Sequence, residues 1–206
     1  MGTITRLVQG KKNPNRVNVY IDGQFALALS IDEVVKNGLK KGQEIDETKL
    51  SELRDVDATG KAYDKILNFL SYRPRTVKEV RDRLYQYEIR DVDKQNSLIK
   101  RLAELGYLDD LKFAQWFIES RNTHRPRSIR YLSQELSSKG VSKDIIRDLT
   151  SHITGEDETI KQLLAKKLGT NRSLSMVERQ KIYSYLGRLG FAWDKIAQVV
   201  KNWESE

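Results

Sequence analysis

An internal repeat is the feature that most constrains how this chain can fold. The run Arg73-Pro74-Arg75-Thr76 recurs 52 residues later as Arg125-Pro126-Arg127-Ser128. The apolar positions that follow recur at the same shift, from Val77, Val80, Leu84 and Ile89 to Ile129, Leu132, Leu136 and Val141. A weaker third copy follows at a further shift of 50, in Ile182, Leu186 and Phe191. Self-similarity at one period is typical of repeat proteins, in which each unit buries its apolar face against its neighbours.

Apolar residues within each copy recur at helical spacing. Examples are Ala62, Ile66, Phe69 and Leu70 in one stretch and Leu98, Leu102 and Leu105 in another. Such spacing places one apolar stripe on one face of a helix. Thr76 to Glu79 and Ser175 to Glu178 have the form of a capping box, in which two side chains satisfy each other's backbone donors at a helix N-terminus. We therefore expect about nine helices between residues 58 and 203, three in each copy.

The second and third copies place glycine at matching positions, with Gly140 before Val141 and Gly190 before Phe191. Helices commonly end at a residue in the left-handed conformation, which glycine adopts without steric cost. The first copy has Glu88 at this position, so the sequence predicts a different helix end there.

The first 30 residues have a different pattern, which is rich in β-branched residues. Asp22-Gly23 lies between two such runs and favours a type I′ hairpin turn, because both central positions of that turn need positive φ. Ser30 then has the form of a helix N-cap, and Gly38 that of a helix stop. We expect three short antiparallel strands followed by two short helices, over residues 3–8, 16–21, 24–29, 30–37 and 46–53.

These patterns predict a mainly α fold of three tandem three-helix repeats, each similar to a helix-turn-helix unit. The repeats are expected to form an elongated, right-angled or curved solenoid, because one unit of about 50 residues buries little apolar area alone. A small N-terminal extension, made of a β-hairpin and short helices, precedes them. The predicted ranges are 1–57 for the extension and 58–109, 110–154 and 155–206 for the three repeats.

Positive charge is concentrated in the repeats. The 206 residues carry a net charge of +8, whereas residues 1–60 hold nine basic and nine acidic side chains. Residues 120–134 contain four arginines and no acid. Basic clusters attract polyanions, so the charge favours nucleic acid or a nucleoprotein as the partner, although a solvated basic surface is also compatible with it.

The sequence contains no recognisable catalytic or metal-binding constellation. It lacks cysteine, a phosphate-binding glycine loop and a His-Glu-x-x-His run. The two histidines, His124 and His152, are 28 residues apart, and His124 is interpreted as a surface residue. Asp109-Asp110 and Glu156-Asp157-Glu158 each open an expected helix, where carboxylates cap backbone donors and complement the helix dipole. We therefore expect no enzyme activity, no metal and no cofactor.

No apolar stretch approaches the roughly 18–20 residues that span a bilayer, and the N-terminus lacks a charged-then-apolar signal pattern. Without cysteine there is no disulfide framework. A cytoplasmic protein with no membrane partner is the simplest interpretation.

The Arg-Pro-Arg motif at residues 73–75 and 125–127 supports two interpretations. Proline ahead of a helix ends the previous segment, which makes the motif structural punctuation. Arginines at a helix N-terminus are also well placed to bind an anion, which the guanidinium and the helix dipole both attract. Aromatic residues that could stack on bases are expected instead to be mostly core or half-buried: Tyr72, Tyr85, Tyr87, Tyr107, Trp116, Tyr131 and Trp193.

Specific segments of the repeats carry a family resemblance. They are Leu70–Thr76, Glu79–Leu84, Leu105–Asp110, Phe113-Ala114, Lys139–Val141 and Arg188–Phe191 with Ile196. Together they resemble the hallmarks of the RecX family, regulators of bacterial recombination. The likeness covers residues 60–203, and the N-terminal hairpin resembles the extension of longer members.

This resemblance implies tandem three-helix repeats and a non-enzymatic modulator of the RecA recombinase. It implies binding in the helical groove of the RecA–single-stranded DNA filament. Such binding would hinder filament growth and the strand exchange, ATP hydrolysis and co-protease functions that depend on the filament.

We expect basic residues of the first two repeats to make the contacts. The candidates are Arg73, Arg75, Arg81, Arg121, Arg125, Arg127, Arg130 and Lys139. The Arg-Pro-Arg motif is absent from the third repeat, so no role follows for it there. Weak, sequence-independent binding to single-stranded DNA and a monomeric chain are also expected. A direct DNA- or RNA-binding protein without a protein partner is the alternative.

One mutational expectation follows from the motif. Packing needs only the apolar positions after it, so Arg125→Glu with Arg127→Glu is expected to leave melting nearly unchanged while weakening filament binding.

Overall fold

The computed structural model describes residues 1–11, 13–151, 153, 155–169 and 173–205. His152, one of the two histidines considered above, lies outside the described residues. The chain divides into two compact units, Met1–Arg73 with Arg81–Tyr107 and Pro74–Val80 with Leu108–Glu206.

The first unit begins with a four-stranded antiparallel sheet in the order β3-β2-β1-β4. Its strands are β1 (Gly2–Gln9), β2 (Arg16–Ile21), β3 (Gln24–Ser30) and β4 (Glu44–Ile45). The three predicted strands are confirmed, and the two-residue β4 is an addition that the sequence pattern did not indicate. Asp22 and Gly23 have φ of 48° and 83°, as the hairpin turn requires. Helix α1 (Ile31–Lys36) is capped by the Ser30 hydroxyl, as predicted.

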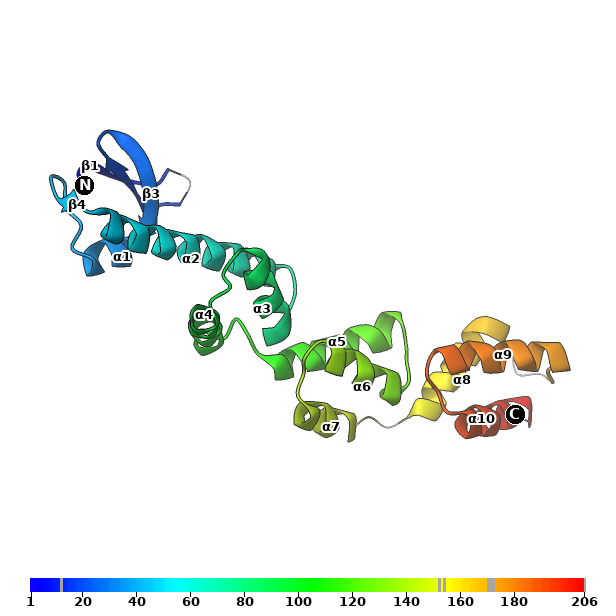
Figure 1. Ribbon diagram of the computed structural model, residues 1–206. Helices are drawn as coiled ribbons and strands as arrows, with labels where there is room; N and C mark the ends of the chain where they lie inside the picture. The colour runs from blue at the N-terminus through cyan, green and yellow to red at the C-terminus, as the bar shows by residue number, and fades with distance from the viewer. Residues whose placement is uncertain (12, 152, 154, 170–172, 206) are drawn as a thin grey trace. The chain divides into compact units, whose positions relative to one another are not determined.

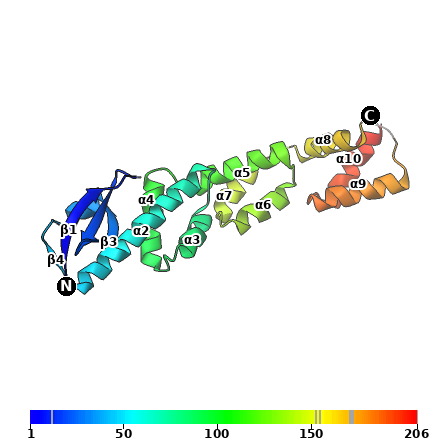
Figure 2. The ribbon, with the colours of Figure 1, turned by 90° about the horizontal axis from the view of Figure 1, so that it is seen from above.

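The second short helix expected near residues 46–53 is wrong. Helix α2 runs for 25 residues, from Glu47 to Ser71, and it contacts β3 of the sheet (Figure 2). A tertiary ion pair explains why an Asp-rich segment with a glycine stays helical. The Arg16 guanidinium of β2 binds the buried Asp57 carboxylate and crosses Gly60, where a Cβ would lie 3.6 Å from it. Such a pair is not visible in local spacing.

Two shorter helices complete the first repeat, α3 (Val77–Gln86) and α4 (Val92–Glu104). Leu98 and Leu102 are buried, as their spacing predicts. Leu105, the C-cap residue of α4, is exposed instead.

The second unit contains two three-helix groups, visible as separate clusters in Figure 1. The first group consists of α5 (Asp110–His124), α6 (Ile129–Ser138) and α7 (Lys143–Ser151). The other consists of α8 (Glu156–Leu168), α9 (Met176–Arg188) and α10 (Trp193–Ser205). Counting described residues only, α2 to α10 are the nine helices expected over 58–203. The mainly helical fold with an N-terminal strand region is thus confirmed, while the four residue ranges stay predictions.

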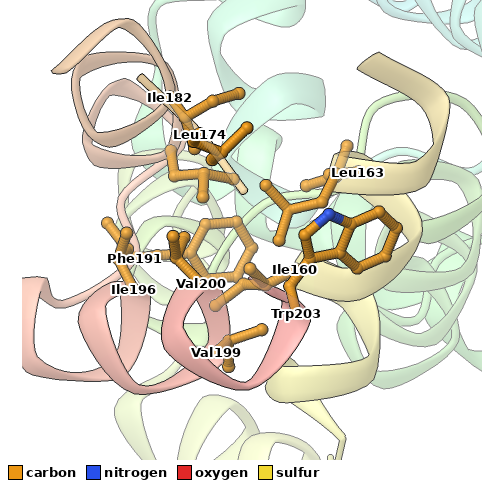
Figure 3. Packing of buried hydrophobic residues seen from close by; sticks show 11 residues of the cluster. Ile160, Leu163, Leu174, Ile182, Phe191, Ile196, Val199, Val200 and Trp203 are labelled. Carbon is orange, nitrogen blue, oxygen red and sulfur yellow. The ribbon is translucent and has the colours of Figure 1, made fainter. Parts of the chain in front are cut away.

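Each of these two groups has its own apolar core. Phe113, Phe117, Leu132 and Leu136 lie in that of α5–α7. In the other group, Figure 3 shows Ile160, Phe191 and Trp203 converging between the three helices. The predicted capping box of Ser175 and Glu178 is present at the start of α9.

The turn after the second helix of each repeat has the same conformation in all three copies. Gly140 and Gly190 have φ of 88° and 94°, as predicted. The expectation of a different helix end at Glu88 is wrong, because Glu88 has φ of 66° and the following Ile89 N–H bonds back to Leu84 O. Glu88 is exposed, so its side chain finds room, at a conformational cost of about 1–2 kcal/mol.

Candidate partner-binding surface

The motif residue Thr76 lies at a contact between the first and second repeats, here called the first junction. Thr76 is fully buried, accepts the Glu79 N–H in the predicted capping box, and donates its hydroxyl to Lys139 O at 2.7 Å. Gly140 follows Lys139, and a Cβ there would lie 2.7 Å from Lys78 Cβ. The glycine therefore serves close packing as well as the left-handed turn.

An acidic residue completes the first junction. Asp110, the first residue of α5, accepts the Val77 N–H at 2.9 Å, so it caps α3 and not its own helix. Burial raises the pKa of the Asp110 carboxyl; the Val77 hydrogen bond opposes this shift, and neighbouring Asp109 adds to it. Asp109 caps α5 itself, at Leu111 and Lys112. The capping role predicted for this acidic pair is correct, but it is divided between two helices.

The second junction repeats this arrangement between the second and third repeats. Ser128 is buried, caps α6, and donates its backbone N–H to Leu189 O at 3.1 Å. Glu156, at the start of α8, accepts the Ile129 N–H at 2.7 Å, as Asp110 does for Val77. A Cβ on Gly190 would lie 2.5 Å from Ser128 Oγ. The Thr or Ser of the Arg-Pro-Arg-Thr/Ser motif is therefore structural at both junctions.

Four of the predicted contact residues are committed to bonds within the chain. Arg81 donates to Gln95 and Asn96 of α4. Arg121 forms a two-bond pair with Glu135 of α6, each bond 3.0 Å, and Lys139 pairs with Glu79 at 3.2 Å. Arg127 lies at the second junction, where it donates to Arg188 O at 3.3 Å and covers the Tyr131 ring at 4.7 Å.

These bonds change the mutational expectation. Arg127→Glu would also remove the bond to Arg188 O at the end of α9, so that variant changes the fold's own contacts as well as the surface charge, and its effect on melting stays a prediction. Arg73 and Arg75 are half-buried and also make contacts. Arg125 and Arg130 remain, one just after α5 and one in the first turn of α6, and both are exposed. His124 beside them is exposed as well. These three residues define what we call the basic edge.

The expectation that most of the seven aromatics are core or half-buried holds for only three of them. Four are more than half exposed, namely Tyr72, Tyr85, Tyr107 and Trp193. The spacing of these aromatics in the sequence predicts helices, but it does not show which face of each helix is buried.

Within the described ranges, no helix is long and apolar enough to cross a membrane. Among those same residues, no group of three or more His, Cys, Asp or Glu side chains is placed to hold a metal ion.

The fold defines the class: an N-terminal strand region is followed by tandem three-helix repeats, with a capped helix end at each of the two junctions. Models of the RecX family match all four parts. The RecX N-terminal domain matches residues 2–46, and the first, second and third RecX three-helix domains match 62–92, 109–149 and 155–200.

Relatives with this name are similar over the whole chain. The regulatory protein RecX of Bacillus velezensis is 33% identical, covering 100% of this chain and 79% of the relative, and that of Bacillus subtilis is 32% identical with the same coverage. The chain belongs to the RecX family of regulatory proteins. A crystal structure of a regulatory protein RecX has the same fold, with a TM-score of 0.72 at 22% identity, covering 98% of this chain and 100% of that one. The crystal structure of RecX from Lactobacillus salivarius has a TM-score of 0.58 at 26% identity, covering 71% of this chain and 97% of that one.

Proposed function

We propose that this chain binds the RecA–single-stranded DNA filament and inhibits the recombinase, ATPase and co-protease activities that need an intact filament. The proposal rests on membership of the RecX family together with the basic edge of the second repeat. In this role the chain acts by binding, without metal, cofactor or chemistry of its own, as a monomer in the bacterial cytoplasm.

The basic edge supports a contact with a polyanionic or acidic surface. Arg125 and Arg130 are exposed, while the nearby Arg121 and Arg127 are held by Glu135 and by Arg188 O. The two bonds of Arg121 and Arg127 fix the backbone on either side of Arg125, and Arg130 lies in the first turn of α6.

Binding to naked single-stranded DNA is expected to be weak and independent of sequence. The affinity should fall steeply as salt rises, because each neutralised phosphate contributes about −0.7 to the log–log salt slope on single strands and the net charge of +8 resides in the repeats. The alternative is a direct DNA- or RNA-binding protein. The observation that favours it is the net charge of +8.

One binding measurement separates these functions. Affinity for a labelled oligonucleotide is compared, at matched salt, with affinity for the same oligonucleotide coated with RecA and a non-hydrolysable nucleotide. We expect clearly tighter binding to the coated form. Equal affinity for both forms would favour the direct nucleic-acid-binding alternative.

A further inference from the structure

The third repeat carries an open groove that the function proposed above does not use. It lies between the first turns of α9 and the start of α10 and has a volume of about 630 Å³. Met176, Tyr183 and Trp193 form its walls, and Leu174 of the third-repeat core, labelled in Figure 3, reaches its floor.

The walls are unusually exposed for large apolar side chains. Met176 is 90% exposed and Trp193 63%. The Trp193 ring is nevertheless held in place, with its centroid 5.6 Å from that of Tyr183 and with Gly187 beneath it, where a Cβ would lie 4.0 Å from the indole. The groove thus brings two exposed large apolar side chains together, whereas single exposed apolar residues need no explanation.

Among the described residues of the groove lining, the charged side chain is that of Arg179, and it is neutralised inside the repeat. Arg179 donates to both Glu204 carboxylate oxygens, at 2.8 and 2.7 Å. Glu204 also accepts the Leu174 N–H at 2.9 Å, which ties the end of α10 to the groove floor. The groove therefore has little net charge with which to attract a polyanion, and an uncharged apolar group complements it best.

The same place in the second repeat is polar. The 50-residue shift aligns Tyr183 with Ser133 and Trp193 with Lys143, and Lys143 is exposed. The second repeat thus has a serine and a lysine where the third has two aromatic residues. Met, Tyr, Trp and Arg are the residue types enriched at the centres of protein–protein interfaces.

We propose that this groove binds an apolar side chain of a protein partner, and not a nucleobase. The inference rests on the proposed function, in which that partner is a RecA subunit of the filament. The basic edge and the groove then contact different parts of one target, the edge by charge and the groove by burial of Trp193.

The test compares wild type with Trp193→Ala, using Tyr85→Ala as the matched control because Tyr85 is a similarly exposed aromatic of the first repeat. We expect Trp193→Ala to weaken binding to the RecA-coated oligonucleotide at least tenfold. Its affinity for the naked oligonucleotide and its melting should be unchanged, and Tyr85→Ala should behave as wild type.

A second readout uses the fluorescence of Trp193, since Trp203 is buried and Trp116 half-buried. The difference between the emission of wild type and that of Trp193→Phe gives the contribution of Trp193. RecA-coated oligonucleotide should protect this contribution from quenching by acrylamide, and naked oligonucleotide should not. If Trp193→Ala binds the coated oligonucleotide as tightly as wild type does, the groove proposal alone is overturned. It is also overturned if Trp193→Ala loses as much affinity for the naked oligonucleotide as for the coated one, because that result would indicate stacking on a base. A wild type with no preference for the coated form overturns the proposed function itself.

Discussion

The two junctions of the second unit share one backbone arrangement but use their cations differently. At both, a buried hydroxyl residue caps a helix, a carboxylate from the next repeat accepts the first N–H, and a left-handed glycine allows close contact. At the first junction, Lys78 donates to Ser138 O and Lys139 pairs with Glu79. At the second, Arg127 donates to Arg188 O and Lys195 pairs with Glu156, whereas Arg130 is exposed. Cap, carboxylate and glycine therefore serve the fold, while the outward cations at the second junction are available for a partner.

The glycines should give the largest effects. Gly190→Ala and Gly140→Ala each combine left-handed strain with a Cβ clash, so each is expected to cost about 3 kcal/mol in the free energy of unfolding. Gly106→Ala is the control, because Gly106 has φ of 75° but nothing within 4 Å of a Cβ, and should cost about 1 kcal/mol. Urea unfolding followed by circular dichroism measures all three. Equal losses would mean that the close contacts at the junctions contribute nothing.

The hydroxyl residues come next, and they should separate the two junctions. Thr76→Ala removes the cap of α3 and the bond to Lys139 O, so about 2 kcal/mol is expected. Ser128→Ala removes only a cap, because its link to Leu189 uses the backbone N–H, so about 1 kcal/mol is expected. The same unfolding measurement applies, with Ser175→Ala as a cap outside either junction. If Ser128→Ala lost more unfolding free energy than Thr76→Ala, the assignment of the additional hydroxyl bond to the first junction would be wrong.

The smallest effect concerns pH and has opposite signs at two carboxylates. The folded pKa of Asp110 is raised by burial, so its contribution to stability is present below its unfolded pKa and falls as pH rises through the folded value. Asp110→Asn keeps an oxygen for Val77 and should gain stability relative to wild type as pH rises from 4 to 7.

Glu204 provides the contrast. The Leu174 hydrogen bond and Arg179 lower its pKa, so its contribution is present above its unfolded pKa and lost as pH falls through the folded value. Glu204→Gln should therefore lose stability near pH 7 and approach wild type in acid. Urea midpoints at several pH values report both variants, and parallel pH trends for the two would contradict these assignments.

The turns and helix caps could be predicted from the sequence, because residues close together in the chain determine them. The Asp22-Gly23 hairpin, both capping boxes and the turns at Gly140 and Gly190 follow from residue types alone. The length of α2 did not, because it depends on Arg16, distant in sequence, binding Asp57. Glu88 shows that a glycine can be replaced at a turn where its side chain has room.

The candidate site was only partly visible in the sequence. The repeated motif located both junctions, but not which of its residues face inward. Only the structure separates Arg127, held against Arg188 O, from Arg125 and Arg130, since that depends on the neighbouring repeat. Glu156 and Asp110 could be recognised in the sequence as acids that open the first helix of a repeat, but not as caps of a helix in the preceding repeat. The Trp193 groove gave none, because helical spacing does not tell a buried face from an exposed one.

The central claim is that the basic edge contacts the filament while the junctions hold the fold. Arg125→Glu with Arg130→Glu tests it, against Lys181→Glu with Lys201→Glu, an equal charge change at exposed lysines of the third repeat. The measurement is inhibition of RecA-driven ATP hydrolysis on single-stranded DNA, with melting followed in parallel. The account predicts unchanged melting for both variants, inhibition weakened about tenfold or more in the arginine variant, and near wild-type inhibition in the lysine variant. Equal inhibition by the arginine variant and wild type would contradict it.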